Sequence, residues 1–410
     1  MRRTSRLYSS GDLEKSLERA LKKRNLAELT FRARHVKKWT AMYCDTSRFL
    51  STLSSLNEEE INSLIDEYHL LVVNIIRQYD PPFLDEIRGP QVLACFSSPS
   101  HAADAAIAIQ KTLQERKQQD ERFACLIPSI GLHTGDFVVR DGSLQQSNAS
   151  NLGKRIETEA DRGMICLSSE TFAALQESGM YKLRYVSTAR VKNIPEPQRI
   201  YKLDWDSAPE SHRMAPGITP VNHPANTADV VSEYMGILIC DIAGSTRKFW
   251  NMGDLEGNLL IEMYRREVFP ILMKYKAVNI EICDGDQIVA CFNEENIPRA
   301  VLAAVEIQKS LFRRNVNMAT RERYKLQTAI GIHTGPVEIM DKKVLHNSTY
   351  FTCKSIQCAA EENEIYLSDE VKEYLKKYDN LTLHPAGEMD MQGGAKTICL
   401  YSLEWYRTGR

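Results

Sequence analysis

Apolar residues follow two patterns along this chain, short continuous runs and longer segments with steps of three and four. The runs 39–45 and 236–241 have strand length, and each ends in an aspartate. Short apolar runs of this kind are typical of buried strands. The segment 61–76 carries apolar residues at helical spacing and predicts an amphipathic helix. Strands and helices are therefore expected to alternate.

Hairpins interrupt this alternation. The segment 280–292 reads as strand, Asp-Gly-type turn and strand, which is a hairpin signal. Hairpins among alternating strands and helices favour an α/β (α+β) sandwich with a mixed or antiparallel sheet. Before the linker, the pattern also predicts strands near 88–96, 127–135 and 199–205, an alanine-rich helix near 100–117 and a helical segment near 151–161.

An internal repeat is the most informative feature of the sequence. Asp45 recurs as Asp241, 196 residues later, and 131–135 (Gly-Leu-His-Thr-Gly) recurs as 331–335 (Gly-Ile-His-Thr-Gly), 200 residues later. Further matched segments lie between and beyond these two. The repeat predicts two homologous domains, at 36–205 and 231–407.

Two other segments flank these domains. Residues 1–38 carry twelve Lys/Arg against four Asp/Glu, and 1–35 is expected to be a basic helical segment with leucines on one face. It is expected to pack that stripe on the body or, alternatively, to contact a membrane surface or a partner. Residues 206–230 hold four prolines and predict a linker.

Composition narrows the class of protein. A net charge of −2 gives no case for a nucleic-acid partner. No apolar run approaches the roughly 18–20 residues that span a bilayer, and no signal-peptide pattern follows Met1. The ten cysteines are scattered without a CxxC pair, which favours buried free thiols over disulfides or zinc. A cytoplasmic protein is expected.

Two carboxylates suggest a metal-binding site. Asp241 ends an apolar strand, and Asp286 lies at the hairpin turn. Carboxylates in such positions suit Mg²⁺, which takes one or two of them together with substrate phosphates. The loop that follows Asp241 offers main-chain N–H groups to an anion. Taken singly, Asp241 could instead cap a helix and Asp286 could be an ordinary turn residue.

Together, the runs 236–246 and 280–292 resemble the class III nucleotidyl cyclase domain, and the resemblance extends over both repeats. It implies two tandem ferredoxin-like domains that pair head to tail, as a pseudo-dimer within one chain or as a domain-paired homodimer. It also implies conversion of a nucleoside triphosphate to a 3′,5′-cyclic nucleotide and pyrophosphate, with two Mg²⁺ or Mn²⁺ ions.

The family's site residues are divided between the repeats. The resemblance implies metal binding at Asp241 and Asp286, with Ile242 also at the metal site, whereas the first repeat has Pro90 in place of Asp286. It implies transition-state groups at Asn151 and Arg155, a spacing that puts both on one helical face. The second repeat has Phe351 and Ser355 there, and Gln392 where the first has Lys192. Triphosphate contacts are expected from Lys192 and from the main chain of Ile242, Ala243, Gly244, Ser245 and Thr246.

The base pocket matches the family less closely. The two base-contacting positions are Glu86 and Leu144. Glutamate can accept from guanine, but leucine cannot form a hydrogen bond. Guanine and a pyrimidine both stay open, the latter because anti-phage uridylate and cytidylate cyclases have altered pockets. The alternative function is an inactive cyclase-fold protein that binds a nucleotide or a regulatory partner.

Overall fold

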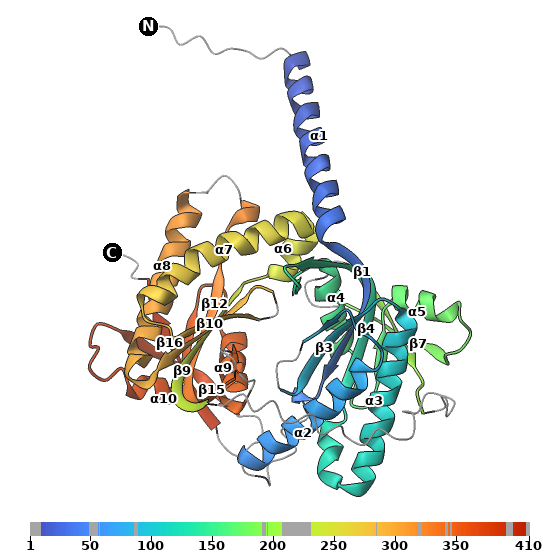
Figure 1. Cartoon of the computed structure of the whole chain (residues 1–410). Coiled ribbons are helices and arrows are strands. Elements are labelled where there is room, and N and C mark those ends of the chain that lie inside the picture. The colour runs from blue at the N-terminus through green and yellow to red at the C-terminus, as the bar shows by residue number, and fades with distance from the viewer. Residues whose placement is uncertain are drawn as a thin grey trace.

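The computed structural model forms two lobes that lie side by side, with one long helix projecting from them (Figure 1). We call 36–206 the N-terminal lobe and 231–406 the C-terminal lobe. The structure describes residues 10–48, 56, 58–85, 89–190, 194, 196–206, 231–283, 285–317, 322–340, 343–344, 347–390 and 397–406.

The N-terminal lobe is one mixed sheet with helices on its faces. Its strands run in the order β2-β3-β1-β4-β6-β8-β7, and β5 pairs with β4. Only the β4–β6 pair is parallel among these pairings. The elements are β1 (Val36–Asp45), α2 (Glu58–Arg77), β2 (Phe83–Leu84), β3 (Gln91–Phe96), α3 (Pro99–Gln119), β4 (Ser129–Arg140), β5 (Ser143–Gln145), α4 (Asn148–Thr158), β6 (Ile165–Leu167), α5 (Ser169–Gln176), β7 (Leu183–Ala189) and β8 (Gln198–Leu203).

The C-terminal lobe repeats this architecture. Its strand order is β10-β11-β9-β12-β14-β16-β15, and β13 pairs with β12. The elements are β9 (Val231–Ile242), α6 (Ser245–Met252), α7 (Asp254–Lys274), β10 (Asn279–Cys283), β11 (Gln287–Asn293), α8 (Ile297–Asn317), β12 (Thr328–Met340), β13 (Lys343–Val344), α9 (Ser348–Ala359), β14 (Ile365–Ser368), α10 (Asp369–Glu373), β15 (Thr382–Asp390) and β16 (Thr397–Glu404). The expected mixed α/β fold with two tandem domains is confirmed.

Strand registers give the correspondence between the lobes residue by residue. Ile130 pairs with Ile165 in one lobe, and Ile330 pairs with Ile365 in the other, so the offset at β4 and β12 is 200. Cys44 pairs with Val92, and Cys240 pairs with Ile288, which gives an offset of 196 at the first hairpin. These are the offsets of the sequence repeat.

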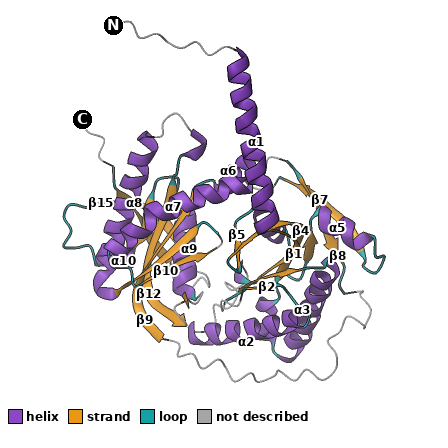
Figure 2. Cartoon of the chain, turned by 45° about the horizontal axis from the view of Figure 1, so that its top comes forward, coloured by secondary structure: helices purple, strands orange, loops and turns teal. Residues whose placement is uncertain are grey.

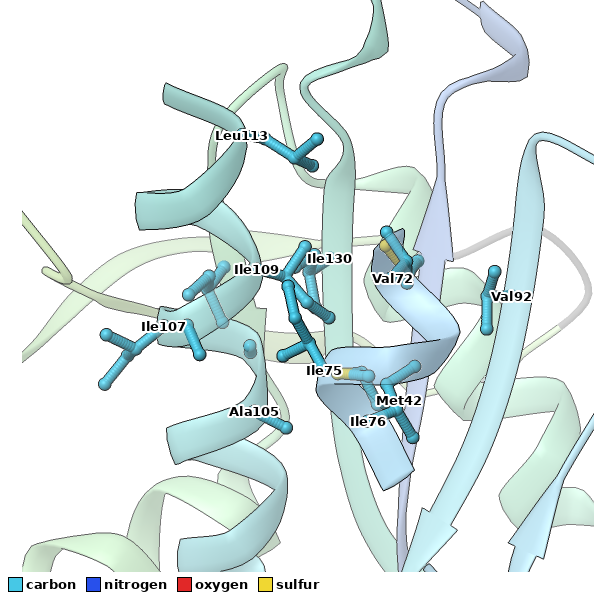
Figure 3. Close-up of a cluster of buried hydrophobic side chains, with 14 of the residues drawn as sticks. Met42, Val72, Ile75, Ile76, Val92, Ala105, Ile107, Ile109, Leu113 and Ile130 are labelled. Atoms are coloured by element: carbon cyan, nitrogen blue, oxygen red, sulfur yellow. The ribbon is translucent and has the colours of Figure 1, made fainter. Parts of the chain in front are cut away.

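Each sheet buries one face under two long helices. In the N-terminal lobe, α2 and α3 cover it with a core that includes Met42, Ile75, Ile109 and Ile130 (Figure 3). In the C-terminal lobe, α7 and α8 play the same part. Burial of such side chains contributes on the order of 1.5–3 kcal/mol each and is the main stabilising term of the fold.

A shorter helix packs on each sheet, α4 on β4 and α9 on β12. Glycine permits the close approach of α4, because a Cβ at Gly131 would lie 2.5 Å from Glu157 Cα. Predicted helix 151–161 is α4, which begins three residues earlier because Ser147 caps its first turn.

The helix α1 (Ser10–His35) projects away from the body, and its C-terminal end contacts β1 and β4 (Figure 2). Leu21, Leu26 and Leu29 are 48%, 66% and 66% exposed. The expected stripe consists of Leu13, Leu17, Ala20 and Leu21. Its described members Ala20 and Leu21 are exposed, so the expectation that they pack on the body is wrong, while Leu13 and Leu17 lie outside the described side chains. Among the described residues, no helix has the length and apolar character of a membrane span.

Candidate functional site

The two aspartates of the C-terminal lobe lie beside each other. Asp241 is the penultimate residue of β9, and Asp286 lies in the turn between β10 and β11. Since Ile288 pairs with Cys240, the antiparallel register brings this turn next to the end of β9. Asp286 is 4% exposed. The fold thus collects two carboxylates at one sheet end, one of them deeply buried.

The surroundings of the buried Asp286 carboxyl shift its pKa upward. Burial and the adjacent Asp241 carboxylate, with which it shares a hydrogen bond, raise the pKa of Asp286 well above its ordinary value. A hydrogen bond from Ser245 opposes this shift in the pKa. The Asp286 Oδ2 atom is buried without a hydrogen-bond partner. Two adjoining carboxyls, one with an orphaned oxygen, fit a divalent cation, which would supply the missing positive charge.

Asp241 and Asp286 are the protein ligands that such a cation would find here. Among the described residues, no group of three or more His, Cys, Asp or Glu side chains has the arrangement of a metal centre. A pair of carboxylates without a third protein ligand is characteristic of a hard cation that also binds substrate oxygens. Ile242, the other residue expected at the metal site, is 2% exposed and can contribute only its main chain.

The loop after Asp241 ends in a left-handed residue. Gly244 has φ +66° and precedes the first turn of α6, whose N-terminus has no side-chain cap. The N–H groups of Ile242 and Ala243 already donate to Asp241 and to the Gln327 carbonyl. Of the expected phosphate loop, the main chain of 244–246 is therefore the part suited to an anion.

The N-terminal lobe presents Asn151 and Arg155 one turn apart on α4. Asn151 Oδ1 accepts a hydrogen bond from Gln146 Nε2 at 3.1 Å, while Asn151 Nδ2 is buried and unpartnered. Arg155 is half-buried, and no ion pair joins it to another described side chain. The helix thus carries an amide donor and a guanidinium that are both available to a ligand.

Contacts between the lobes bring α4 to the lobe that carries Asp241 and Asp286. The Asn148 N–H donates to the Asp254 carboxylate at 2.8 Å, and Gln146 Nε2 lies 3.4 Å from Ser245 Oγ. A Cβ at Gly285 would lie 2.6 Å from Gln146 Cβ, so the turn that carries Asp286 packs directly on Gln146. We call this surface the seam: 146–151 of the N-terminal lobe against 245–258 and 285–286 of the C-terminal lobe.

Unsatisfied polar atoms gather around the seam. Native structures leave few buried polar atoms without a partner, and each such atom calls for a reason. In the described part of the chain, five of these atoms belong to seam residues or to the arginine that holds the 285–286 turn: Gln146 Oε1, Asn148 Oδ1, Asn151 Nδ2, Arg265 Nε and Asp286 Oδ2. Donors and acceptors from both lobes therefore converge on one region.

The equivalent position in the N-terminal lobe is closed by its own hydrogen bonds. Asp45 Oδ1 accepts from the N–H and hydroxyl of Ser47, and Asp45 Oδ2 accepts from Gln91 at 2.6 Å and lies 3.6 Å from Lys154 Nζ. Gln91 pairs with Asp45, so the preceding residue, Pro90, stands where the other lobe has Asp286. A cation would find one neutralised carboxylate and a proline there.

The helix α9 is apolar where α4 is polar. The caps Ser147 and Asn347 fix the same offset of 200, so Phe351 and Ser355 replace Asn151 and Arg155. Phe351 is 6% exposed and packs with Tyr350 and Cys353 in a hydrophobic cluster. We call the positions equivalent to the candidate site (Asp45, Pro90, Phe351 and Ser355) the sibling site. The part of it on α9 is filled by apolar side chains.

Leu144 lies in β5 opposite Val139 and packs against an apolar cluster with Tyr43 and Phe137. It offers a hydrophobic wall to a ligand and no hydrogen bond. Glu86 and Lys192, the other residues expected to contact the substrate in this lobe, lie outside the described residues, as does Gln392.

A cavity of about 700 Å³ lies at one end of α4, between α1, β1, β4 and the α6–α7 junction. Its lining includes Trp39, His133, Asn148, Trp250 and Asp254. Neither aspartate of the metal pair nor Asn151 and Arg155 borders it, so the candidate site rests on the convergence of polar groups at the seam.

Sequence reasoning missed Gln146, Asp254 and Arg265. Arg265 on α7 donates to the Gly285 carbonyl at 2.7 Å and holds the turn that carries Asp286. Gln146 directly precedes the capping residue of α4, and this position is the one local signal that could have placed it near the site. Nothing in the spacing of Asp254 or Arg265 distinguishes them from surface residues of a helix.

The match to a known protein family lies in one of the two lobes. Residues 230–404 match the family model described as the adenylate and guanylate cyclase catalytic domain. This match falls on the C-terminal lobe. No curated protein matches the chain.

Solved structures show the same fold. A class III adenylyl cyclase-like ATP-binding protein from Pseudomonas aeruginosa aligns with a TM-score of 0.57 and 14% identity, over 82% of this chain and 85% of that one. That alignment spans both lobes. The adenylyl cyclase CyaB from P. aeruginosa (TM-score 0.40, 18% identity) and the guanylyl cyclase Cya2 (TM-score 0.37, 18% identity) cover 44% and 42% of this chain, and 98% and 93% of their own.

Proposed function

We propose that this protein is a nucleotidyl cyclase with one composite site, which joins metal ligands of the C-terminal lobe to transition-state groups of the N-terminal lobe. The observation that carries the proposal is the gathering of unpartnered polar atoms from both lobes at the seam. The cyclase model matched by residues 230–404 supports the reaction class.

The reaction is an intramolecular displacement. The 3′-oxygen of the ribose attacks the α-phosphorus, the bond from that phosphorus to its bridging oxygen breaks, and pyrophosphate leaves while the 3′-hydroxyl proton passes to solvent. Mg²⁺ or Mn²⁺ ions held by Asp241 and Asp286 supply positive charge for the triphosphate and for the developing 3′-oxyanion when bound.

The chain's own groups orient the substrate and stabilise charge. The main chain of 244–246, at the uncapped start of α6, binds phosphate oxygens. The free Asn151 Nδ2 donates to the ribose, and the Arg155 guanidinium pairs with the phosphoryl oxygens as their charge redistributes. We assign Lys192 to the triphosphate and Glu86 with Leu144 to the base.

The test is an assay of the purified chain with Mn²⁺ and each of ATP, GTP, CTP and UTP. We expect one nucleotide to yield a 3′,5′-cyclic product and pyrophosphate in equal amounts. The apolar Leu144 favours a base other than adenine, so GTP, UTP or CTP is expected to be preferred over ATP.

A second candidate is nucleotide binding without turnover. The solved structure that aligns over 82% of this chain is described as a class III adenylyl cyclase-like ATP-binding protein, and the sibling site here is filled. Tight binding of a nucleotide without cyclic product from any of the four would favour this candidate and contradict the cyclase proposal.

A further inference from the structure

Gln146 contacts both halves of the proposed site. It lies between β5 and the capping residue of α4, and it is 5% exposed. Its side-chain Nε2 donates to Asn151 Oδ1 at 3.1 Å within its own lobe and lies 3.4 Å from Ser245 Oγ in the other. Its carbonyl oxygen accepts from Asn258 Nδ2 at 3.1 Å.

The contact with Asn151 fixes how that amide is turned. A carboxamide has one accepting end and one donating end. Because Gln146 occupies the accepting end of Asn151, the donating end is the one left free, and it is the buried, unpartnered Nδ2. An acceptor at position 146 would instead attract the Asn151 N–H₂ group and turn its oxygen outward.

The contact of Gln146 with Ser245 links Gln146 to the pair of aspartates. Ser245 opens α6 and forms a hydrogen bond with the Asp286 carboxyl. The turn that carries Asp286 also presses on Gln146, since a Cβ at Gly285 would lie 2.6 Å from Gln146 Cβ. A continuous line of hydrogen bonds thus runs from Asn151 through Gln146 and Ser245 to Asp286.

We propose that Gln146 is a positioning residue that orients the Asn151 amide toward the substrate and aligns α4 with the start of α6. The inference rests on the proposed function and adds a residue to it. Gln146 acts through Asn151, so its contribution disappears when Asn151 is removed.

The test compares Gln146→Met, which keeps volume and removes both the donor and the acceptor of the side-chain amide, with Gln145→Met as a matched control. Gln145 is the preceding residue of the same type, and its amide contacts the Ser143 carbonyl of its own strand at 3.4 Å. We expect Gln146→Met to lower kcat by about 10- to 100-fold with KM changed less than about threefold. Gln145→Met should change kcat less than about twofold.

The decisive comparison is made in an Asn151→Ala background. There Gln146→Met should lower kcat by less than about twofold further, because the group that it positions is gone. An equal loss in both backgrounds, or wild-type kcat in Gln146→Met, overturns the inference. Gln146→Glu is a second variant: it keeps the size of the side chain, its carboxylate form cannot donate to Asn151 Oδ1, and it should show the same loss.

A readout without turnover separates this inference from the proposed function. The side-chain N–H₂ signals of Asn151 in ¹⁵N-edited NMR should shift in Gln146→Met and not in Gln145→Met. Wild-type protein that forms no cyclic product contradicts the proposed function. Unchanged Asn151 signals in Gln146→Met contradict the positioning role, whatever the wild-type activity.

Discussion

The main-chain N–H of Asn148 donates to the Asp254 carboxylate at 2.8 Å, and this bond joins the first residue of α4 to the first residue of α7 in the other lobe. The Asn148 side chain also donates to the Phe249 carbonyl at 3.4 Å. The helix that carries Asn151 and Arg155 is therefore anchored at its start on the lobe that carries the aspartate pair.

The Asp254 carboxyl makes stability depend on pH. Burial, opposed by the Asn148 hydrogen bond, raises the pKa of Asp254 to about 6 from 3.8. The folded protein thus holds this proton more tightly than the unfolded chain. The contribution is fully present below about pH 4 and is lost as pH rises through 6, and it amounts to roughly 2–3 kcal/mol.

Urea unfolding of wild type and Asp254→Asn between pH 4 and 7 measures this contribution. The free energy of unfolding of the wild type should fall relative to that of Asp254→Asn as pH rises over this range. A constant difference between the two proteins would contradict the assignment.

Gly285 is required at the seam for two reasons. Its φ is +91°, and a Cβ would lie 2.6 Å from Gln146 Cβ. Gly285→Ala should therefore force the lobes apart and lower kcat by about 10- to 100-fold.

The control for this substitution is Gly142→Ala. Gly142 has φ +77° with nothing within 4 Å of an added Cβ, so it carries the backbone strain without the collision. It should cost about 1 kcal/mol of stability and leave kcat nearly unchanged. Equal losses of activity in the two variants would show that strain alone, and not the seam, explains the result for Gly285.

We expect Phe351 to stabilise the fold at the sibling site and to take no part in turnover. The side chain is 6% exposed in an apolar cluster, so Phe351→Ala should lower the free energy of unfolding by about 3–5 kcal/mol. Ser355→Ala, on the same helix and half-buried, should stay within about 0.5 kcal/mol. Below its melting transition, Phe351→Ala should retain kcat within about twofold, and a large loss there would place the sibling site in the reaction.

Local features of the chain could be predicted because they follow from local physics. The apolar run before Asp241 dictates a buried strand, and the turn sequence before Gln287 dictates a hairpin, whatever the rest of the chain does. The offsets of the repeat then assign Pro90 and Phe351 to the positions of Asp286 and Asn151 without coordinates.

Contacts between lobes could not be predicted in the same way. Gln146 meets Ser245 and Gly285 only because the two lobes pack in one orientation, and no periodicity along the chain encodes that orientation. The same holds for α1, where Leu21, Leu26 and Leu29 face solvent because the helix extends beyond the surface that could cover them.

The measurement that tests the composite site most directly is the rate of cyclic nucleotide formation in Asp241→Asn, Arg155→Ala and Asp45→Asn, each assayed with Mn²⁺. Asp241→Asn and Arg155→Ala should each lower the rate by about 10²- to 10⁴-fold, because they remove groups from opposite sides of the seam. Asp45→Asn should keep it within about threefold, since Ser47, Gln91 and Lys154 already surround that carboxylate. A loss in Asp45→Asn as large as in Asp241→Asn, or full activity in Arg155→Ala, would contradict a single site shared by the two lobes.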